Sequence, residues 1–251
     1  MTIPANNVLL SASKIVQDTT NVRWPIEELL QWLNDGQREI VLHRPDANPK
    51  TAVMTLAAGT RQTLKDKVAE GVAGGVGSSI SPAKLLDVIA VATGTSATTI
   101  NRTAAVRKIE REVLDAQNPS WHSATGVTAV KHFMVDPRDP LSFYVYPPAA
   151  ATGASLEVLF SAYPTDIGIT AGAVTGNISL ADIYGNALLD YVLYRAYSKD
   201  SDYAGNANRA QAHYTAFANS LGIELKGTLM MGAQNTWNPN TPNRAAQAPQ
   251  G

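Results

Sequence analysis

The stretch SLADIYGNALLDYVLYRAYSKDSDYAGNANRAQAHYTAFANSLG, residues 179–222, decides the fold, because it predicts two consecutive amphipathic helices with almost no connector. In each helix the apolar residues recur three and four positions apart, which places them on one face. The first stripe comprises Leu180, Ile183, Tyr184, Ala187, Leu188, Tyr191 and Val192, and the second comprises Tyr203, Ala207, Ala210, Tyr214, Phe217 and Leu221. We expect a helical hairpin that begins at a capping box of Ser179 and Asp182 and ends at Gly222 as C-cap.

Two further helices are predicted near the start of the chain, at residues 6–17 and 25–43. The second begins at Trp24-Pro25, carries Glu27 and Glu28 in its first turn, and is stopped by Pro45. Its apolar stripe comprises Ile26, Leu29, Leu30, Leu33, Ile40 and Val41. We expect all four helices to pack together as a bundle.

Gly36 interrupts the second of these helices, where it costs about 1 kcal/mol relative to alanine. The close approach of another backbone would explain it. Asn34 lies beside the apolar stripe, and a buried asparagine must find hydrogen-bond partners. We interpret Asn34, Asp35 and Gln37 as structural ties to a neighbouring element, with a ligand site as the alternative.

The middle of the chain changes to short β-prone runs. Candidate strands lie at 52–57, 63–64, 85–91, 127–135, 141–146 and 156–163, and a short charged helix with Val106, Ile109, Val113 and Leu114 ends near residue 118. Short turns join the last three strands, which favours an antiparallel meander or part of a small sandwich. Residues 167–177 are expected to be a loop. The fold class is therefore α+β, with a helical bundle and a separate β-rich lobe.

Composition limits the classes of function. The chain has 251 residues, 45% of them hydrophobic, a net charge of −1 and a pI of about 6.4. Such a balance argues against a protein that grips nucleic acid through its phosphates. There is no cysteine, no apolar run long enough to cross a membrane and no signal-like segment near Met1. We expect no disulfide, no membrane span and no export signal.

A search for catalytic or metal-binding residues finds little. The histidines are His43, His122, His132 and His213, and His132 with Asp136 is the best imitation of a His/Asp pair, although the spacing does not force a contact. Residues 70–81 are rich in glycine but lack the Lys-Ser or Lys-Thr of a phosphate-binding loop. We therefore expect no catalytic residue, no cofactor and no metal, and we interpret the histidines as structural.

Three segments resemble a family of tailed-phage virion proteins, the head-to-tail adaptors that form a ring beneath the portal. The hairpin carries most of the resemblance, in Asp182-Ile183-Tyr184, in the run from Leu189 to Asp200, and in Gly205-Asn206 with Arg209-Ala210. The other two segments run from Trp24-Pro25 to Ala47, and from Pro119-Ser120-Trp121-His122 to Pro147-Pro148. Together they span residues 20–220.

The resemblance implies a structural virion protein in the neck, between capsid and tail, made in the host bacterial cytoplasm. Its expected partners are the portal protein, tail or tail-tube proteins, and further copies of itself in a dodecameric ring, with genomic DNA passing through the channel during ejection. The expected division is a helical bundle at 1–48 and 178–226, a β-rich lobe at 49–177 and an extended tail at 227–251. The alternative is a small-ligand-binding module or hydrolase that uses the β-rich lobe.

Two sets of residues are candidates for protein contacts. The tail cannot build a core of its own, and the resemblance assigns it to portal docking through Met230, Met231, Trp237, Pro239 and Pro242; a disordered appendage is the alternative. Tyr194, Tyr197 and Tyr203 on the helical hairpin suit either a subunit interface or the edge of the core.

Overall fold

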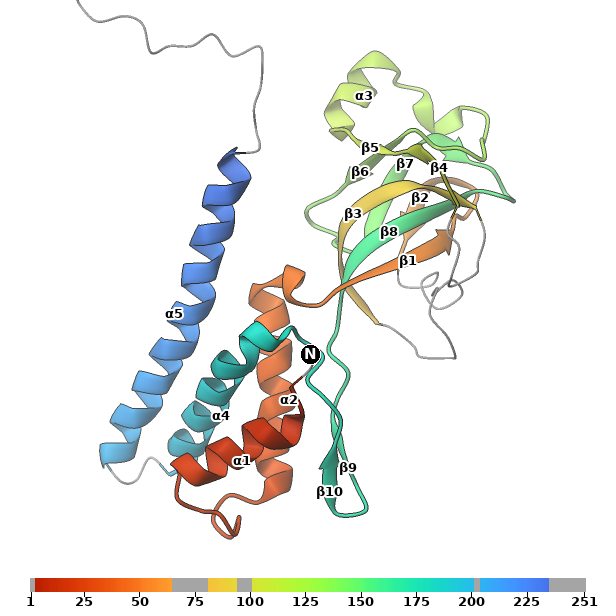
Figure 1. Ribbon diagram of the computed structural model, residues 1–251. Helices are drawn as coiled ribbons and strands as arrows, with labels where there is room; N and C mark the ends of the chain where they lie inside the picture. Colours follow the sequence, from red (N-terminus) through yellow and green to blue (C-terminus); the bar gives the residue numbers. More distant parts are fainter. Residues whose placement is uncertain (1–2, 65–80, 94–100, 201–203, 235–251) are drawn as a thin grey trace, which may run out of the picture.

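Helices gather in one lobe of the protein and strands in the other (Figure 1). The computed structural model describes residues 3–64, 81–93, 101–200 and 204–234, the last of them by backbone alone from residue 223. The helical lobe contains α1 (Ala5–Ile15), α2 (Ile26–His43), α4 (Gly185–Lys199) and α5 (Ala204–Gln234). A short helix, α3 (Arg111–Gln117), lies at the far end of the β lobe. The predicted α+β class is confirmed.

The helical lobe buries most of the stripes that the sequence predicted. Three predicted members are wrong, because Ile183, Ala207 and Tyr214 are exposed. Leu29, Leu33 and Ile40 of α2 and Leu188 and Val192 of α4 are inaccessible to solvent and belong to one apolar cluster. Burying such a side chain contributes about 1.5–3 kcal/mol, so the cluster stabilises the bundle. The spacing of the stripes therefore predicted the helices and most of the residues on their inward faces.

Gly36 marks the closest approach of α2 to α4. A Cβ at this position would lie 2.8 Å from Cδ1 of Tyr191 and 3.3 Å from Cδ2 of Leu188. The approach predicted for this glycine is therefore real, but the approaching group is a side chain and not a backbone. Only a residue without a side chain leaves room for the Tyr191 ring so close to α2.

The capping box predicted at the start of α4 is wrong. The helix begins at Gly185, after a 3₁₀ turn at Asp182–Tyr184, and neither Ser179 nor Asp182 caps it. The Ser179 hydroxyl instead accepts a hydrogen bond from the Thr165 N–H (3.1 Å), and the Asp182 carboxylate accepts one from the Ile3 N–H (3.1 Å). Both side chains serve distant segments of the chain, which a local pattern cannot show.

The β lobe consists of two four-stranded sheets. Their strands are β1 (Pro49–Thr55), β8 (Ser155–Ala162), β3 (Pro82–Thr93) and β4 (Asn101–Ala105) in the first sheet, and β2 (Gly59–Thr63), β7 (Ser142–Ala149), β6 (His132–Val135) and β5 (Arg107–Lys108) in the second. Every pair is antiparallel except β5 with β6. Apolar side chains from both sheets, including Phe160 and Phe143, form one core. The sandwich alternative is therefore the correct one.

The predicted meander fails at β8. β6 and β7 pair as neighbours, but β8 lies between β1 and β3 in the other sheet. Its inward residues Leu156, Val158 and Phe160 alternate along the strand and belong to the shared core. Because β8 is buried between two strands of distant sequence, the short turn before it could not reveal its partners.

Two other segments differ from expectation. Residues 167–177, expected as a loop, form a hairpin of β9 (Gly168–Thr170) and β10 (Ala173–Thr175) whose two turn residues, Ala171 and Gly172, have positive φ. The helix expected from Val106 begins only at Arg111, because β5 pairs with β6 just before it.

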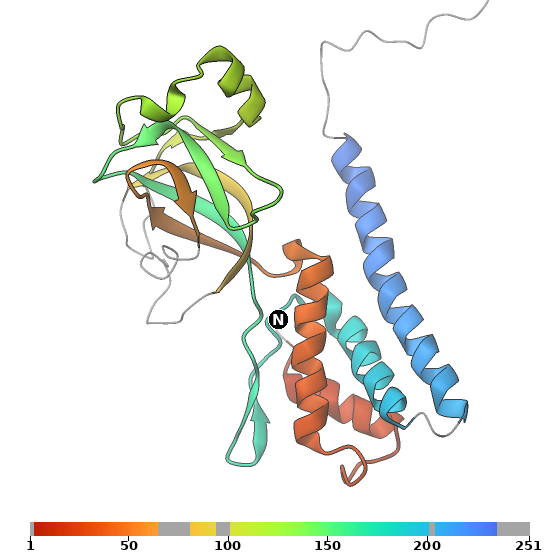
Figure 2. The ribbon, with the colours of Figure 1, turned by 180° about the vertical axis from the view of Figure 1, so that it is seen from behind.

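Helix α5 continues beyond Gly222 to Gln234, so the C-cap predicted at Gly222 is wrong. A glycine costs a helix about 1 kcal/mol, which the neighbouring helix-forming residues can offset. Residues 227–234, expected to be extended, are helical as well. At about 1.5 Å per residue α5 is about 46 Å long, whereas α4 is about 22 Å, so α5 overhangs its partner. Figure 2 shows this overhang from behind.

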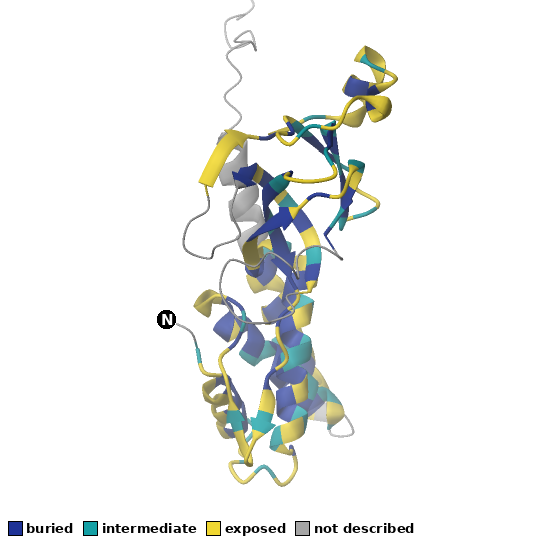
Figure 3. Ribbon diagram, turned by 90° about the vertical axis from the view of Figure 1, so that its right-hand side faces the viewer, coloured by how far each residue is buried: buried dark blue, intermediate teal, exposed yellow. Residues whose placement is uncertain are grey.

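Polar contacts fix the junction between the lobes. The Arg44 guanidinium, buried at the end of α2, donates to both carboxylate oxygens of Asp46 (3.1 and 2.7 Å) and lowers the pKa of that carboxyl. The Asn48 side chain donates to the Ala162 carbonyl (3.0 Å). Figure 3 shows buried residues continuing from the helices into the strands, with α3 largely exposed.

Candidate assembly surfaces

Rings from α4 and α5 interlock along the hairpin. The ring centroids of Tyr191 and Phe217 are 5.2 Å apart, and those of Tyr194 and Tyr214 are 5.1 Å apart. Tyr191 and Phe217 are buried, Tyr194 is half-buried, and 42% of Tyr214 is exposed. Burial raises the pKa of the Tyr191 hydroxyl. The cluster thus runs from the core to the surface, and Tyr194 lies at its edge.

Tyr197 also lies at a core edge. Its ring is buried and stacks on His213, with centroids 5.7 Å apart and planes 9° apart. Arg209, on α5, places its guanidinium 5.7 Å from the centroid of the Tyr197 ring. Tyr203 lies outside the described residues, and the role of these tyrosines in a subunit interface stays a prediction.

A hollow of about 590 Å³, named here the basic hollow, opens where α1, α2, α4 and α5 have their ends. Its lining includes Arg23, Trp24, Tyr197, Asp200, Asn206 and Arg209. Arg23 forms an ion pair with Asp200 and lies 5.2 Å from the Trp24 ring centroid. Asn206, which is buried, donates to the Asp200 carboxylate at 2.7 Å. The lining of the hollow thus holds two arginines and one carboxylate, and the carboxylate pairs with Arg23.

A second polar surface, named here the acidic ledge, follows α2 and the chain beside it. Its charged residues are Glu27, Asp35, Arg38 and Asp166. Arg38 donates to Asp35 (3.0 Å) and to Asp166 (2.6 Å). Glu27 is exposed and forms no ion pair with a described residue. Three carboxylates against one guanidinium leave the ledge acidic.

Two of the three polar residues beside Gly36, Asn34 and Gln37, tie α2 to a neighbouring segment, as predicted, whereas Asp35 pairs with Arg38 of the same helix. The Asn34 side chain both donates to the Ile167 carbonyl and accepts from the Ile167 N–H, each at 3.0 Å. The Gln37 carbonyl oxygen accepts from the Ser179 N–H at 2.7 Å. These bonds bind α2 to the chain returning from the β lobe and hold Asp166 beside the helix.

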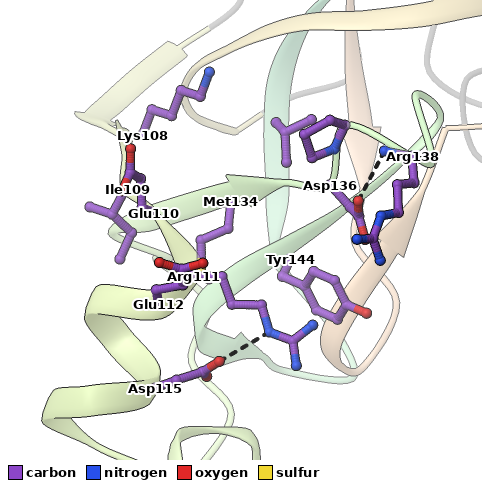
Figure 4. Close-up of a pocket in the computed structure, with 12 residues that line it drawn as sticks. Lys108, Ile109, Glu110, Arg111, Glu112, Asp115, Met134, Asp136, Arg138 and Tyr144 are labelled. Carbon is purple, nitrogen blue, oxygen red and sulfur yellow. Dashed lines mark hydrogen bonds and ion pairs between the residues drawn. The ribbon is translucent and has the colours of Figure 1, made fainter.

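A third hollow, at the far end of the β lobe, has a volume of about 650 Å³ (Figure 4). Arg111 lies 5.4 Å from the Tyr144 ring centroid and donates to Asp115 at 3.2 Å. Figure 4 shows Arg138 on the other side of Tyr144, and its backbone N–H donates to Asp136 (2.9 Å). The lining of this hollow contains no histidine, serine or cysteine, so no Ser–His or Cys–His pair lies in it.

The four histidines have different neighbours. His43 contacts Glu39 at 3.2 Å, His122 contacts the Thr60 hydroxyl at 2.9 Å, and His213 contacts Asp190 at 2.9 Å. Nδ1 of His132 is buried without a hydrogen-bond partner among the described residues, and its ring stacks on Tyr146.

Asp136, which the sequence placed with His132, accepts the Arg138 N–H instead. Within the described ranges, no group of three or more histidine and carboxylate side chains could hold a metal ion. No helix in the described part of the chain is long and apolar enough to cross a membrane. The glycine-rich residues 70–80 lie outside the described residues.

The residues assigned to portal docking are placed only in part. Met230 and Met231 belong to the overhanging end of α5, whereas Trp237, Pro239 and Pro242 lie outside the described residues.

Sequence reasoning missed the basic hollow and the acidic ledge. Each joins residues far apart in the chain, such as Arg23 with Arg209 and Glu27 with Asp166. The one local signal was the arginine at position 209, within the segment that carried the family resemblance.

Comparison with known proteins identifies the class of this chain. A family model described as SU10 adaptor protein matches residues 7–245. A search of the curated proteins finds no match. The family match makes the chain a structural protein of a bacteriophage and a component of the virion. The chain belongs to the SU10 adaptor protein family, a family of phage head-to-tail adaptors.

Proposed function

We propose that this adaptor assembles as a ring, with twelve copies as the expected number, beneath the portal in the neck of the virion. The ring connects the capsid to the tail and surrounds the channel through which DNA is ejected. Membership of the adaptor family is the observation that carries this proposal. The net charge of −1 supports it, because a channel that lets DNA slide must not hold the phosphates.

The C-terminal segment makes the contact with the portal in this proposal. By ring contacts, Tyr194 lies beside Tyr214 and Tyr191 beside Phe217, so the two helices run antiparallel and α4 begins at Gly185 near the level of residue 223. The remaining turns of α5, about 18 Å of helix, extend past α4. A helix that overhangs its own bundle can present the segment containing Met230, Met231 and Trp237 to another protein.

Deletion of residues 235–251 tests this contact, because it removes no helix or strand among the described elements. We expect the truncated protein to keep the circular dichroism spectrum of the full chain and to lose binding to purified portal. Trp237→Ala should weaken binding as well, whereas Gln247→Ala in the same segment serves as the matched control. Unchanged portal binding by the truncated chain would exclude Trp237 and the residues after it from the contact, and would leave the helices, including Met230 and Met231 of α5, as the docking surface.

Ring formation is tested separately, by negative-stain microscopy of the full chain alone and with portal. Rings that cap the portal support the proposal. A chain that stays monomeric in both samples contradicts it. The same preparations tested against tail proteins identify the partner below the ring.

A further inference from the structure

The basic hollow and the acidic ledge have no lining residue in common, although they come close in sequence at Trp24 and Glu27. The hollow includes the first turns of α5, and the ledge follows α2 beside the chain that leads into the β9–β10 hairpin. Figures 1 and 2 both show α5 on one side of the bundle and this hairpin on the other. One copy can therefore offer both surfaces at once.

Each arginine of the hollow lies over an aromatic ring, in a position to contact an anionic partner. Arg209 lies over Tyr197, is exposed, and forms no ion pair with any residue that the structure describes. Arg23 lies over Trp24 and shares Asp200 with Asn206. A guanidinium resting on an aromatic face loses little further freedom when a carboxylate binds, which favours recognition.

The ledge supplies the matching anion. Glu27 lies in the first turn of α2 and is exposed. Beside it, Asp35 and Asp166 are held in place by their shared contact with Arg38. A carboxylate and a guanidinium can form two parallel hydrogen bonds, which fixes the orientation of the groups that carry them.

We propose that copies of this chain contact one another head to tail, with the acidic ledge of one copy in the basic hollow of the next and Glu27 against Arg209. This inference rests on the proposed ring and names its contact surfaces. Because the two surfaces differ, the contact is heterologous, and repeating it closes a ring when the rotation between neighbouring copies is a whole fraction of a turn. Opposite charges on the two faces also select the orientation in which copies associate.

Cross-linking tests the contact directly, because the chain has no cysteine. Arg209→Cys and Glu27→Cys are made separately, and the two proteins are mixed under conditions of assembly and treated with a short bismaleimide. We expect a covalent dimer containing one copy of each variant, and no dimer from either variant alone. Lys108→Cys, on the exposed surface of the β lobe, replaces Glu27→Cys as the control and should give no dimer with Arg209→Cys.

Charge reversal provides a second test. Arg209→Glu and Glu27→Arg should each weaken self-association by about tenfold or more, since like charges would then face each other. Mixing the two variants should restore assembly, because each damaged surface then finds a complementary one. That rescue separates a lost contact from a misfolded chain.

Three results would overturn the inference. The first is that both charge-reversed variants assemble as well as the wild type, and the second is that their mixture does not regain assembly. The third is that the two cysteine variants assemble together but give no mixed cross-link. The first two leave the ring itself intact, and the proposed function with it. A wild-type chain that never assembles, even with portal, overturns both.

Discussion

Replacing Gly36 with alanine places a methyl group where α2 and α4 are closest. The new Cβ would lie 2.8 Å from one Tyr191 ring atom, 3.2 Å from another, and 3.3 Å from a Leu188 methyl. The first distance is too short for a carbon–carbon contact, so the ring must move. Tyr191 is buried and its ring is held by Phe217 and Tyr194, which leaves it little room.

The expected change combines two opposite terms. Alanine favours the helix over glycine by about 1 kcal/mol, and overpacking a filled core costs about 1–3 kcal/mol. Gly222 in α5 provides a control with the first term alone, because a Cβ there meets no atom within 4 Å. Gly222→Ala should therefore stabilise the protein by up to about 1 kcal/mol, and Gly36→Ala should be about 1–3 kcal/mol less stable than that control.

Urea unfolding followed by helical circular dichroism measures both variants against the wild type, with the transition slope checked for constancy. A double-mutant cycle with Tyr191→Leu identifies the cause, since the penalty of Gly36→Ala should shrink when the ring is absent. Equal stabilisation by the two alanines would refute the close approach of α4. A destabilising Gly222→Ala would instead place Gly222 at a helix end and contradict the continuation of α5.

The remaining predictions concern the same lobe. Leu188→Ala should cost about 2–5 kcal/mol in urea unfolding, because the side chain is completely buried. The Asp18 carboxylate accepts hydrogen bonds from the Trp24, Val22 and Arg23 N–H groups, which hold its pKa below the usual 3.8. The stability that the carboxylate provides is therefore present above about pH 4 and is lost as the pH falls through its folded pKa. The difference in stability between the wild type and Asp18→Ala should vanish in acid. Burial raises the pKa of the Tyr191 hydroxyl above 10.0. The neutral hydroxyl's contribution to stability is therefore complete below pH 10 and is lost as the pH rises through the folded pKa. In urea titrations at alkaline pH, Tyr191→Phe should lose less stability than the wild type.

Much of the helical lobe could be predicted from the sequence because its signals are local. The three- and four-residue spacing of Leu29, Leu33 and Ile40 determines which face of α2 is buried, whatever covers it. The same holds for Leu188 and Val192 in α4. The interpretation of Asn34 succeeded for a related reason, because a buried asparagine must find hydrogen-bond partners. For Gly36 only the close approach was predicted correctly, since a side chain and not a backbone approaches it.

The polar surfaces could not be predicted in this way. Glu27 and Arg209 look like ordinary helix-surface charges in the sequence, and only the packing of α1, α2, α4 and α5 brings Arg209 near Arg23. Ser179 and Asp182 show the opposite failure, since their spacing matches a local cap but their hydrogen bonds go to Thr165 and Ile3. In Ser179 and Asp182 the tertiary packing, and not the local spacing, determines the hydrogen-bond partner.

By itself, the sequence determined the α+β class, the positions of the long helices and the resemblance to phage adaptors. The reason is that amphipathic periodicity and family motifs involve residues that are close together in the sequence. Only the tertiary structure decided that β8 lies between β1 and β3, that α5 overhangs α4, and that charges distant in sequence gather on two surfaces of the bundle. The physical reason is that helices satisfy their hydrogen bonds within one segment, whereas strand partners, helix contacts and composite surfaces depend on segments far apart in the chain.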